Sequence, residues 1–260
     1  MDWNKTKTIF IITFLLLDIF LIYQFLEMRN NNQLMILTEK TIEENLAADD
    51  ITYDKIPEVE ERGKYLSGIS RLFTEEELAK LADQDIPIVD TTIVESTLLT
   101  PYPLEEAKFD FLLNQFFNEY IIDGDKYIFW EMDEELDQII FYQLYNDKVI
   151  YNEENSSIIV QLNDLNEIIS YKQTMLNIEE YEKEEEIIPA IKALEILHNK
   201  NLLKFGSQIT EIELGYYSIV PFTTPQSKVL TPTWQFVVND KENYYVNAFE
   251  GKVIDEESLE

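Results

Sequence analysis

The chain has 260 residues, of which 51 are acidic and 20 are basic, so its formal net charge is −31 at pH 7. Such an acidic chain repels nucleic acid and anionic lipid headgroups, which excludes binding to a phosphate backbone. Cysteine is absent and there is one histidine, so disulfides, thiolate catalysis and zinc sites made of cysteine or several histidines are also excluded. The hydrophobic share of 45% is sufficient to bury a core in one large domain or two small ones.

An apolar run, IFIITFLLLDIFLIYQFL, extends from Ile9 to Leu26. As a helix it would rise roughly 27 Å, which is close to the thickness of the hydrocarbon core of a bilayer. The residues that follow, LEMRNNNQ, offer no small-residue cleavage site, so the run predicts an uncleaved transmembrane anchor at residues 9–26. Lys5 and Lys7 precede it, which favours a cytoplasmic tail at residues 1–8 and a body outside the cell membrane.

Asp18 lies in the middle of this apolar run. A central aspartate costs roughly 2.5 to 3.5 kcal/mol on insertion into a bilayer. One interpretation is that the side chain is protonated or locally hydrated. The other is that it forms a hydrogen bond with a second transmembrane helix. We predict such a helix contact, with Phe14, Leu21 and Ile22 completing the partner-binding surface.

The N-terminal sequence MDWNKTKTIFIITFLLLDIFLIYQF resembles the start of the YycI (WalI) family, on Trp3, the run from Lys5 to Thr8 and the apolar stretch after it. The C-terminal stretch PTWQFVVNDKENYYVNAFEGKVID resembles the closing hairpin of that family, and similar endings occur in PepSY-like domains. The resemblance implies a non-enzymatic regulator from a Gram-positive bacterium. It also implies that the chain binds a WalK-type sensor histidine kinase and a companion protein, YycH, through its transmembrane helix and outer domain to tune cell-wall homeostasis.

Residues 27–102 are predicted to form a membrane-proximal helix followed by a mixed segment. The stretch NNNQLMILTEKTIEENLAADD has the spacing of a short helix, KYLSGISRLF and IPIVDTTIVESTLL read as strands, and TEEELAKLA reads as a helix. Thr74 is expected to cap this helix, with Glu77 in the register of a capping box. Pro101 and Pro103 are expected to end the second strand.

Residues 103–178 and 179–260 are predicted to form two lobes, each a helix followed by an antiparallel sheet. In the first lobe, a helix from Leu104 to Tyr120 has one apolar face and precedes the strands DGDKYIFWEM, DQIIFYQLYNDKVIY, SSIIVQLN and EIISYKQTML. In the second, the acidic stretch EEYEKEEE leads into a helix with Pro189 in its first turn, before the strands QITEIELGYYSIV, TWQFVVN and YYVNAFEGKVI. The predicted fold class is α+β, similar to YycH and YycI.

No residue pattern predicts catalysis, a cofactor or a metal. His198 lies beside an apolar helix stripe and is expected to be a partly buried helix residue. Asp123 with Asp125, and the acidic group from Glu131 to Asp137, could serve a glycosidase or bind calcium, but both fall at expected turns. The sequence also has no G-x-S-x-G or S-x-x-K string. We therefore predict a protein that is not an enzyme.

The aromatic strands leave a second function open. Alternation places roughly half of each strand inside, and the remaining aromatic side chains could expose a patch for a protein or a glycan. The alternative to the kinase regulator is thus an exported PepSY-like binding module that inhibits or escorts a cell-wall hydrolase or protease.

Overall fold

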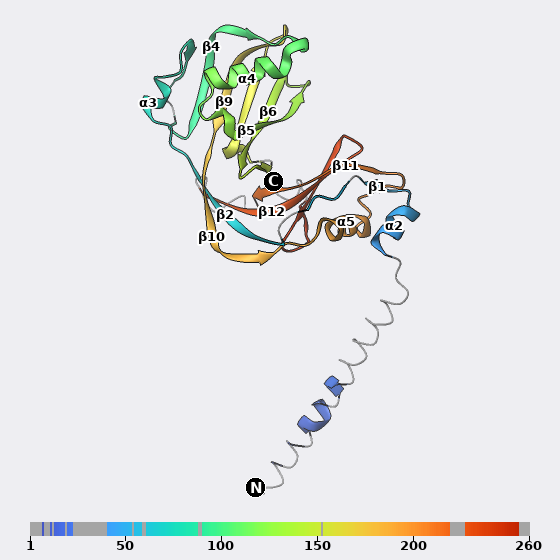
Figure 1. The fold of residues 1–260 in the computed structure, drawn as a ribbon. Coiled ribbons are helices and arrows are strands. Elements are labelled where there is room, and N and C mark those ends of the chain that lie inside the picture. Colours follow the sequence, from blue (N-terminus) through green and yellow to red (C-terminus); the bar gives the residue numbers. More distant parts are fainter. Residues whose placement is uncertain are drawn as a thin grey trace. The chain divides into compact units, whose positions relative to one another are not determined.

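A computed structural model describes residues 7, 11, 13–18, 20–22, 41–53, 55–58, 61–87, 90–151, 153–218 and 227–254 of the chain (Figure 1). The chain forms two compact units, Met1–Asp49 and Asp50–Glu260. In the first unit the described residues among positions 7–22 are helical, and helix α2 covers Ile42–Ala48. Thr41 and Glu44 form a capping box at its start, which satisfies two backbone N–H groups and agrees with the short helix predicted there.

The second unit is an α+β structure dominated by one large sheet of 14 strands, with few helices. Its strands are β1 (Thr52–Tyr53), β2 (Arg62–Ser70), β3 (Gln84–Asp85), β4 (Ile93–Pro103), β5 (Tyr127–Asp133), β6 (Gln138–Tyr145), β7 (Lys148–Tyr151), β8 (Ser157–Leu162), β9 (Glu167–Thr174), β10 (Leu176–Glu186), β11 (Gln208–Ser218), β12 (Ser227–Val238), β13 (Glu242–Asn247) and β14 (Val253–Ile254). Its helices are α3 (Glu75–Leu78), α4 (Phe109–Tyr120) and α5 (Ala190–Asn199), with short 3₁₀ turns at Glu106–Lys108, Gly124–Lys126 and Glu154–Ser156. The fold class therefore agrees with the prediction, while the domain boundaries at residues 102 and 178 remain predictions.

The main strand order is β10-β2-β12-β11-β7-β6-β8-β9-β4-β3. We call β3, β4, β5, β6, β8 and β9 the β6 group, and β1, β2 and β10 to β14 the β12 group. Strand β7 joins them, because it pairs with β6 on one side and with β11 on the other.

The expectation of purely antiparallel sheets is wrong at two places. Strand β7 is parallel to β11, with Ile150 opposite Tyr216 and Tyr151 opposite Tyr217, and the short strand β1 is also parallel to β11. Both pairings join strands that are far apart in the chain, so no turn signal between neighbouring strands could reveal them.

Helix α4 covers the β6 group and closes its core (Figure 1). It buries Leu113, Phe116 and Phe117, and Phe117 packs on the ring of Phe141 with 4.4 Å between centroids. The helix begins later than predicted, at Phe109, because Glu106–Lys108 form a 3₁₀ turn ahead of it. Strand β4 continues through Pro101 and ends at Pro103. The β4–β9 register is irregular between Thr97 and Tyr102, so Pro101, which has no backbone N–H, is not required to donate a regular strand–strand hydrogen bond.

Helix α5 packs against the β12 group, where Trp234 donates its indole N–H to the carbonyl oxygen of Ile188 at 2.8 Å. Pro189 is the N-cap of α5 and not part of its first turn. The acidic stretch before it does not lead into the helix as predicted, since it forms strand β10 and pairs with β2. Lys64 on β2 forms an ion pair with Glu180 at 2.8 Å, and this opposite charge helps the acidic strand to pair.

The chain passes from the β6 group to the β12 group at Met175, between β9 and β10. The side chain of Gln143 on β6 is buried there and holds both backbone groups of Leu176, donating to its carbonyl oxygen and accepting from its N–H, each at 2.9 Å. The backbone N–H of Arg71 donates to Met175 at 2.8 Å. One amide side chain thus replaces a strand partner where the chain changes from one group to the other.

Candidate functional site

The structure places the four predicted partner-binding residues on a helix. Phe14, Asp18, Leu21 and Ile22 are all helical and exposed, and their spacing puts them on one helix face. The described residues include only parts of the run from 9 to 26, and they contain no helix both long and apolar enough to cross a membrane. Contact with a partner helix therefore remains a prediction.

Asp123 belongs to a structural ion-pair network. Its backbone is left-handed, with φ of 50°, and its carboxylate accepts from Arg71 at 2.7 Å and from Lys126 at 3.0 Å. Partial burial opposes its ionisation, but the hydrogen bonds and charges of Lys126 and Arg71 prevail and lower the pKa of Asp123. Asp123 is therefore a fixed anion that holds the turn after α4, as the turn interpretation predicts.

The other candidate groups also have structural positions. Asp133 accepts from the backbone N–H groups of Glu135 and Leu136 at 2.9 and 3.0 Å, which closes the β5–β6 turn. His198 is half-buried in the last turn of α5, as its helix stripe predicts. Within the described part of the chain, no cluster of three or more His, Asp or Glu side chains is arranged to hold a metal ion.

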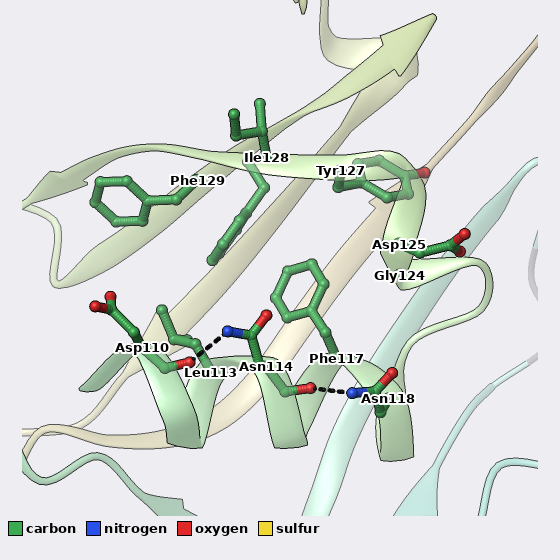
Figure 2. Close-up of a pocket in the computed structure, with 11 residues that line it drawn as sticks. Asp110, Leu113, Asn114, Phe117, Asn118, Gly124, Asp125, Tyr127, Ile128 and Phe129 are labelled. Carbon is green, nitrogen blue, oxygen red and sulfur yellow. Dashed lines mark hydrogen bonds between the residues drawn. The ribbon is translucent and has the colours of Figure 1, made fainter. Parts of the chain in front are cut away.

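A groove with a volume of about 400 Å³ lies between α4 and β5, and we call it the α4–β5 groove. Figure 2 shows Phe117 extending from α4 toward β5, with Asp110 near one end of the groove and Asp125 near the other. The lining consists of an apolar floor and a polar rim: Asp110, Leu113, Asn114, Phe117, Asn118, Gly124, Asp125, Tyr127, Ile128, Phe129 and Phe141.

The floor of the groove is apolar because α4 does not fully cover β5. Phe129 lies opposite Phe141 and Met132 lies opposite Ile139, so both belong to the sheet face that α4 covers. Phe141 and Ile139 are buried, whereas Phe129 and Met132 stay 45% and 42% exposed. The groove thus continues the aromatic core of the β6 group out to the surface.

The rim of the groove is anionic. Neither Asp110 nor Asp125 forms an ion pair with any residue that the structure describes. The two lysines nearby in sequence are engaged, Lys108 with Glu105 at 2.8 Å and Lys126 with Asp123 at 3.0 Å. Residues 105–133 contain eight acidic and two basic side chains, so the segment around the groove has an excess of negative charge.

Strand β5 lies at an edge of the sheet formed by the described strands. It pairs with β6, and no other described strand pairs with it. Trp130 lies at a register shift between Phe129 and Glu131 and packs on the rings of Tyr142 and Tyr151, with centroids 5.3 and 5.7 Å away. The sequence predicts an aromatic strand here but not its place at an edge. Its one visible signal is the consecutive run Ile128-Phe129-Trp130, which alternation cannot bury on one face.

A second pocket, of about 320 Å³, lies between β2, β10, β11 and the β6–β7 turn. Its charged side chains are Arg62, Lys64, Lys148, Glu180 and Glu184. Glu180 accepts from Lys64 at 2.8 Å and from the hydroxyl of Tyr145 at 3.1 Å, and these hydrogen bonds lower the pKa of the Glu180 carboxyl. The opposite charges of this pocket largely compensate one another, so it contributes to holding β2 on β10.

Comparison with known proteins places the chain in a family. Residues 30–249 match the family model of the YycI protein, whereas no curated protein sequence matches the chain. Among solved structures, an uncharacterized protein from Eubacterium rectale ATCC 33656 is similar at 10% identity with a TM-score of 0.47, over 80% of this chain and 91% of that one. YycH from Bacillus subtilis is similar at 16% identity with a TM-score of 0.42, over 73% of this chain and 54% of that one. The family match includes α4, α5 and most of the sheet, and the chain therefore belongs to the YycI family.

Proposed function

We propose that the chain is a non-enzymatic accessory regulator of a two-component system, which binds a WalK-type sensor histidine kinase and a YycH-like companion to tune cell-wall homeostasis. The observation that carries this proposal is the match of residues 30–249 to the YycI family. The roles of Asp123 and Asp133 support a binding protein over a hydrolase, because both carboxylates hold turns of the fold. The exposed apolar groove beside α4 supports the same function, since such surfaces bind partners.

In this proposal residues 9–26 anchor the protein in the cell membrane, residues 1–8 lie in the cytoplasm, and the body lies outside. The anchor contributes to partner binding through the face formed by Phe14, Asp18, Leu21 and Ile22. The exposed positions of these side chains on the helix support such a contact. A hydrogen bond from Asp18 to a partner helix would offset the cost of placing its polar group in lipid.

The test is site-specific photo-crosslinking of the full chain in membranes that also contain the kinase and the companion. A crosslinker at Leu21 is expected to capture a partner, whereas one at Leu16, on the opposite side of the same helix, serves as the matched control. Asp18→Asn is expected to preserve capture, because either side chain can hydrogen-bond, and Asp18→Leu is expected to weaken it. Equal capture from both positions, or normal kinase output with Asp18→Leu, would reject the helix contact.

A chimera separates the anchor from the body. Residues 1–30 are replaced by an unrelated single span, and kinase output is followed with a reporter of its response regulator. We expect the chimera to stay in the membrane and to regulate more weakly than the native chain. Full regulation by the chimera would assign the whole effect to the body.

A further inference from the structure

We propose that the α4–β5 groove binds an extended segment of a partner protein that has apolar side chains at alternate positions and a basic side chain at each end, and whose backbone adds to the free edge of β5. The inference rests on the proposed function in one respect, namely that the body acts by binding another protein. It adds the surface, the conformation of the bound segment and its chemistry.

The backbone argument comes from the position of β5. The strand is seven residues long and pairs on one side with β6, so the N–H and C=O groups of its other edge have no described strand partner. Such an edge is a template for another strand, and natural proteins usually block it when it is not used. The groove runs beside this edge, so a segment added to β5 would place every second side chain on the α4 side.

The floor of the groove selects apolar side chains at those alternate positions. Phe129 is 45% exposed although it packs edge-on against Phe141 at 5.8 Å and against Phe109 at 6.3 Å. Met132, on the same face of the strand, is 42% exposed. An apolar side chain seated over Phe117 and Phe129 would remove this surface from water, which is the main favourable term in such binding.

The polar lining selects basic side chains. Asn114 and Asn118 donate their side-chain N–H groups to the carbonyl oxygens of Asp110 and Asn114, each at 2.8 Å, as the dashed lines in Figure 2 show. Their own Oδ1 atoms and the carboxylates of Asp110 and Asp125 remain as acceptors around the groove. A lining of acceptors with negative charge near both ends is complementary to a segment that carries lysine or arginine at each of its ends.

The same charges argue against a second copy of this chain as the occupant. Two copies joined through β5 would bring together two regions of eight acidic and two basic side chains each. Like charges placed directly opposite in a strand pair are destabilising. An anionic membrane surface is disfavoured for the same reason.

The experiment uses the full chain in an uncharged detergent and a labelled synthetic peptide of alternating threonine and valine with a central phenylalanine and with lysine at both ends. Binding is followed by fluorescence anisotropy at two salt concentrations. In one control peptide glutamate replaces lysine, which removes the charge match. In the other the backbone nitrogens are methylated, which removes the ability to add as a strand. The groove variant carries both Asp110→Lys and Asp125→Lys. The matched control variant carries both Asp164→Lys and Glu211→Lys, at exposed positions outside the groove.

We expect the basic peptide to bind, both control peptides to fail, and salt to weaken binding. The groove variant should lose at least about tenfold in affinity, because two attractive contacts become repulsive, while the matched variant should lose much less. Hydrogen exchange of the β5 amides should slow in the complex. Absence of binding, equal losses in both variants, or equal binding of the methylated peptide would overturn the proposal.

The outcome also separates this inference from the proposed function. Partner cross-links without peptide binding would reject the groove and leave the regulatory function in place. Peptide binding without any cross-link to the kinase or companion would support the groove and reject those partners.

Discussion

The ring of Tyr151 on β7 lies directly against Gly215 on β11. A Cβ atom on Gly215 would come within 2.4 Å of the ring and of the carbonyl oxygen of Val149. Glycine is therefore required here by the close approach of two parallel strands, where β7 joins the β6 group to the β12 group. The packing of this junction leads to the first two predictions.

Gly215→Ala is expected to lower the free energy of unfolding by about 3 kcal/mol or more, because both the aromatic ring and the Val149 backbone would have to move. Urea denaturation of the full chain in detergent measures the change. Gly63→Ala is the comparison, since its Cβ would meet side-chain atoms alone among its three nearest neighbours, those of Ile187 from 2.8 Å and of Pro232 at 3.4 Å. A similar loss in both variants would contradict a special role for the junction.

Tyr151→Phe is expected to be neutral or to stabilise the protein by up to about 1 kcal/mol, because its buried hydroxyl has no hydrogen-bond partner among the described residues. Tyr127→Phe is the matched change with the opposite expectation. The hydroxyl of Tyr127 donates to the carbonyl oxygen of Thr174 at 2.5 Å, and its loss should destabilise by about 1 to 2 kcal/mol. Thermal unfolding of the two variants side by side tests the contrast, and a destabilised Tyr151→Phe would show that the hydroxyl has a partner.

Gln143→Met is expected to destabilise the protein by about 2 to 4 kcal/mol, since it removes both hydrogen bonds to the backbone of Leu176 and keeps the side-chain volume. Gln161→Met is the control, because Gln161 bonds at a more exposed turn. Denaturation midpoints give the two changes in unfolding free energy. Equal losses of unfolding free energy in the two variants would mean that the burial of Gln143 does not increase the contribution of its hydrogen bonds to stability.

Acid should weaken the fold through the Arg71 cluster. Arg71 bonds to Asp123 and Glu77, and lies 5.4 Å from the ring centre of Phe73. The pKa of Glu77 is lowered, first by the backbone N–H of Thr74 and also by Arg71, and the pKa of Asp123 is lowered as well. Because both pKa values are lower in the folded state, their contribution is present above the ordinary carboxyl pKa and is lost as the pH falls through the folded value.

The check is the difference in unfolding free energy between the native chain and Asp123→Asn, measured from pH 7 to pH 3. Asparagine tolerates the left-handed backbone at this position, so the change affects mainly the charge. We expect the difference to be largest near pH 7 and to shrink in acid. Protonation also reduces the repulsion within a chain of net charge −31, in the native chain and in the variant alike. Taking the difference between the two unfolding free energies removes this common effect. A difference independent of pH would contradict the assignment.

Sequence patterns predicted those elements whose causes are local. The box formed by Thr74 and Glu77 was predictable because both hydrogen bonds lie within three residues. The short helix at α2 and the succession of strands β5, β6, β8 and β9 were predictable for the same reason, from spacing and turn residues.

Long-range pairing explains what the sequence did not reveal. Taken alone, the acidic residues of β10 favour a coil or the segment before a helix. Their pairing as a strand depends on Lys64, which lies 116 positions away from Glu180 in the chain. The exposed floor of the α4–β5 groove depends on β5 being at an edge, which no pattern within Tyr127–Asp133 states. The transmembrane face around Asp18 was read from residue types alone, and it remains a prediction that the crosslinking experiment addresses.

The place of β2 between β10 and β12 sets an order for folding. The chain is made from its N-terminus, so β2 emerges early, yet both of its neighbours in the sheet are among the last strands to be made. The β6 group closes on itself between Gln84 and Thr174 and can condense while synthesis continues. Strand β2 must wait as an open, unpaired segment, and it carries Arg62 and Lys64, charges of the kind that disfavour the pairing of an exposed strand with other chains.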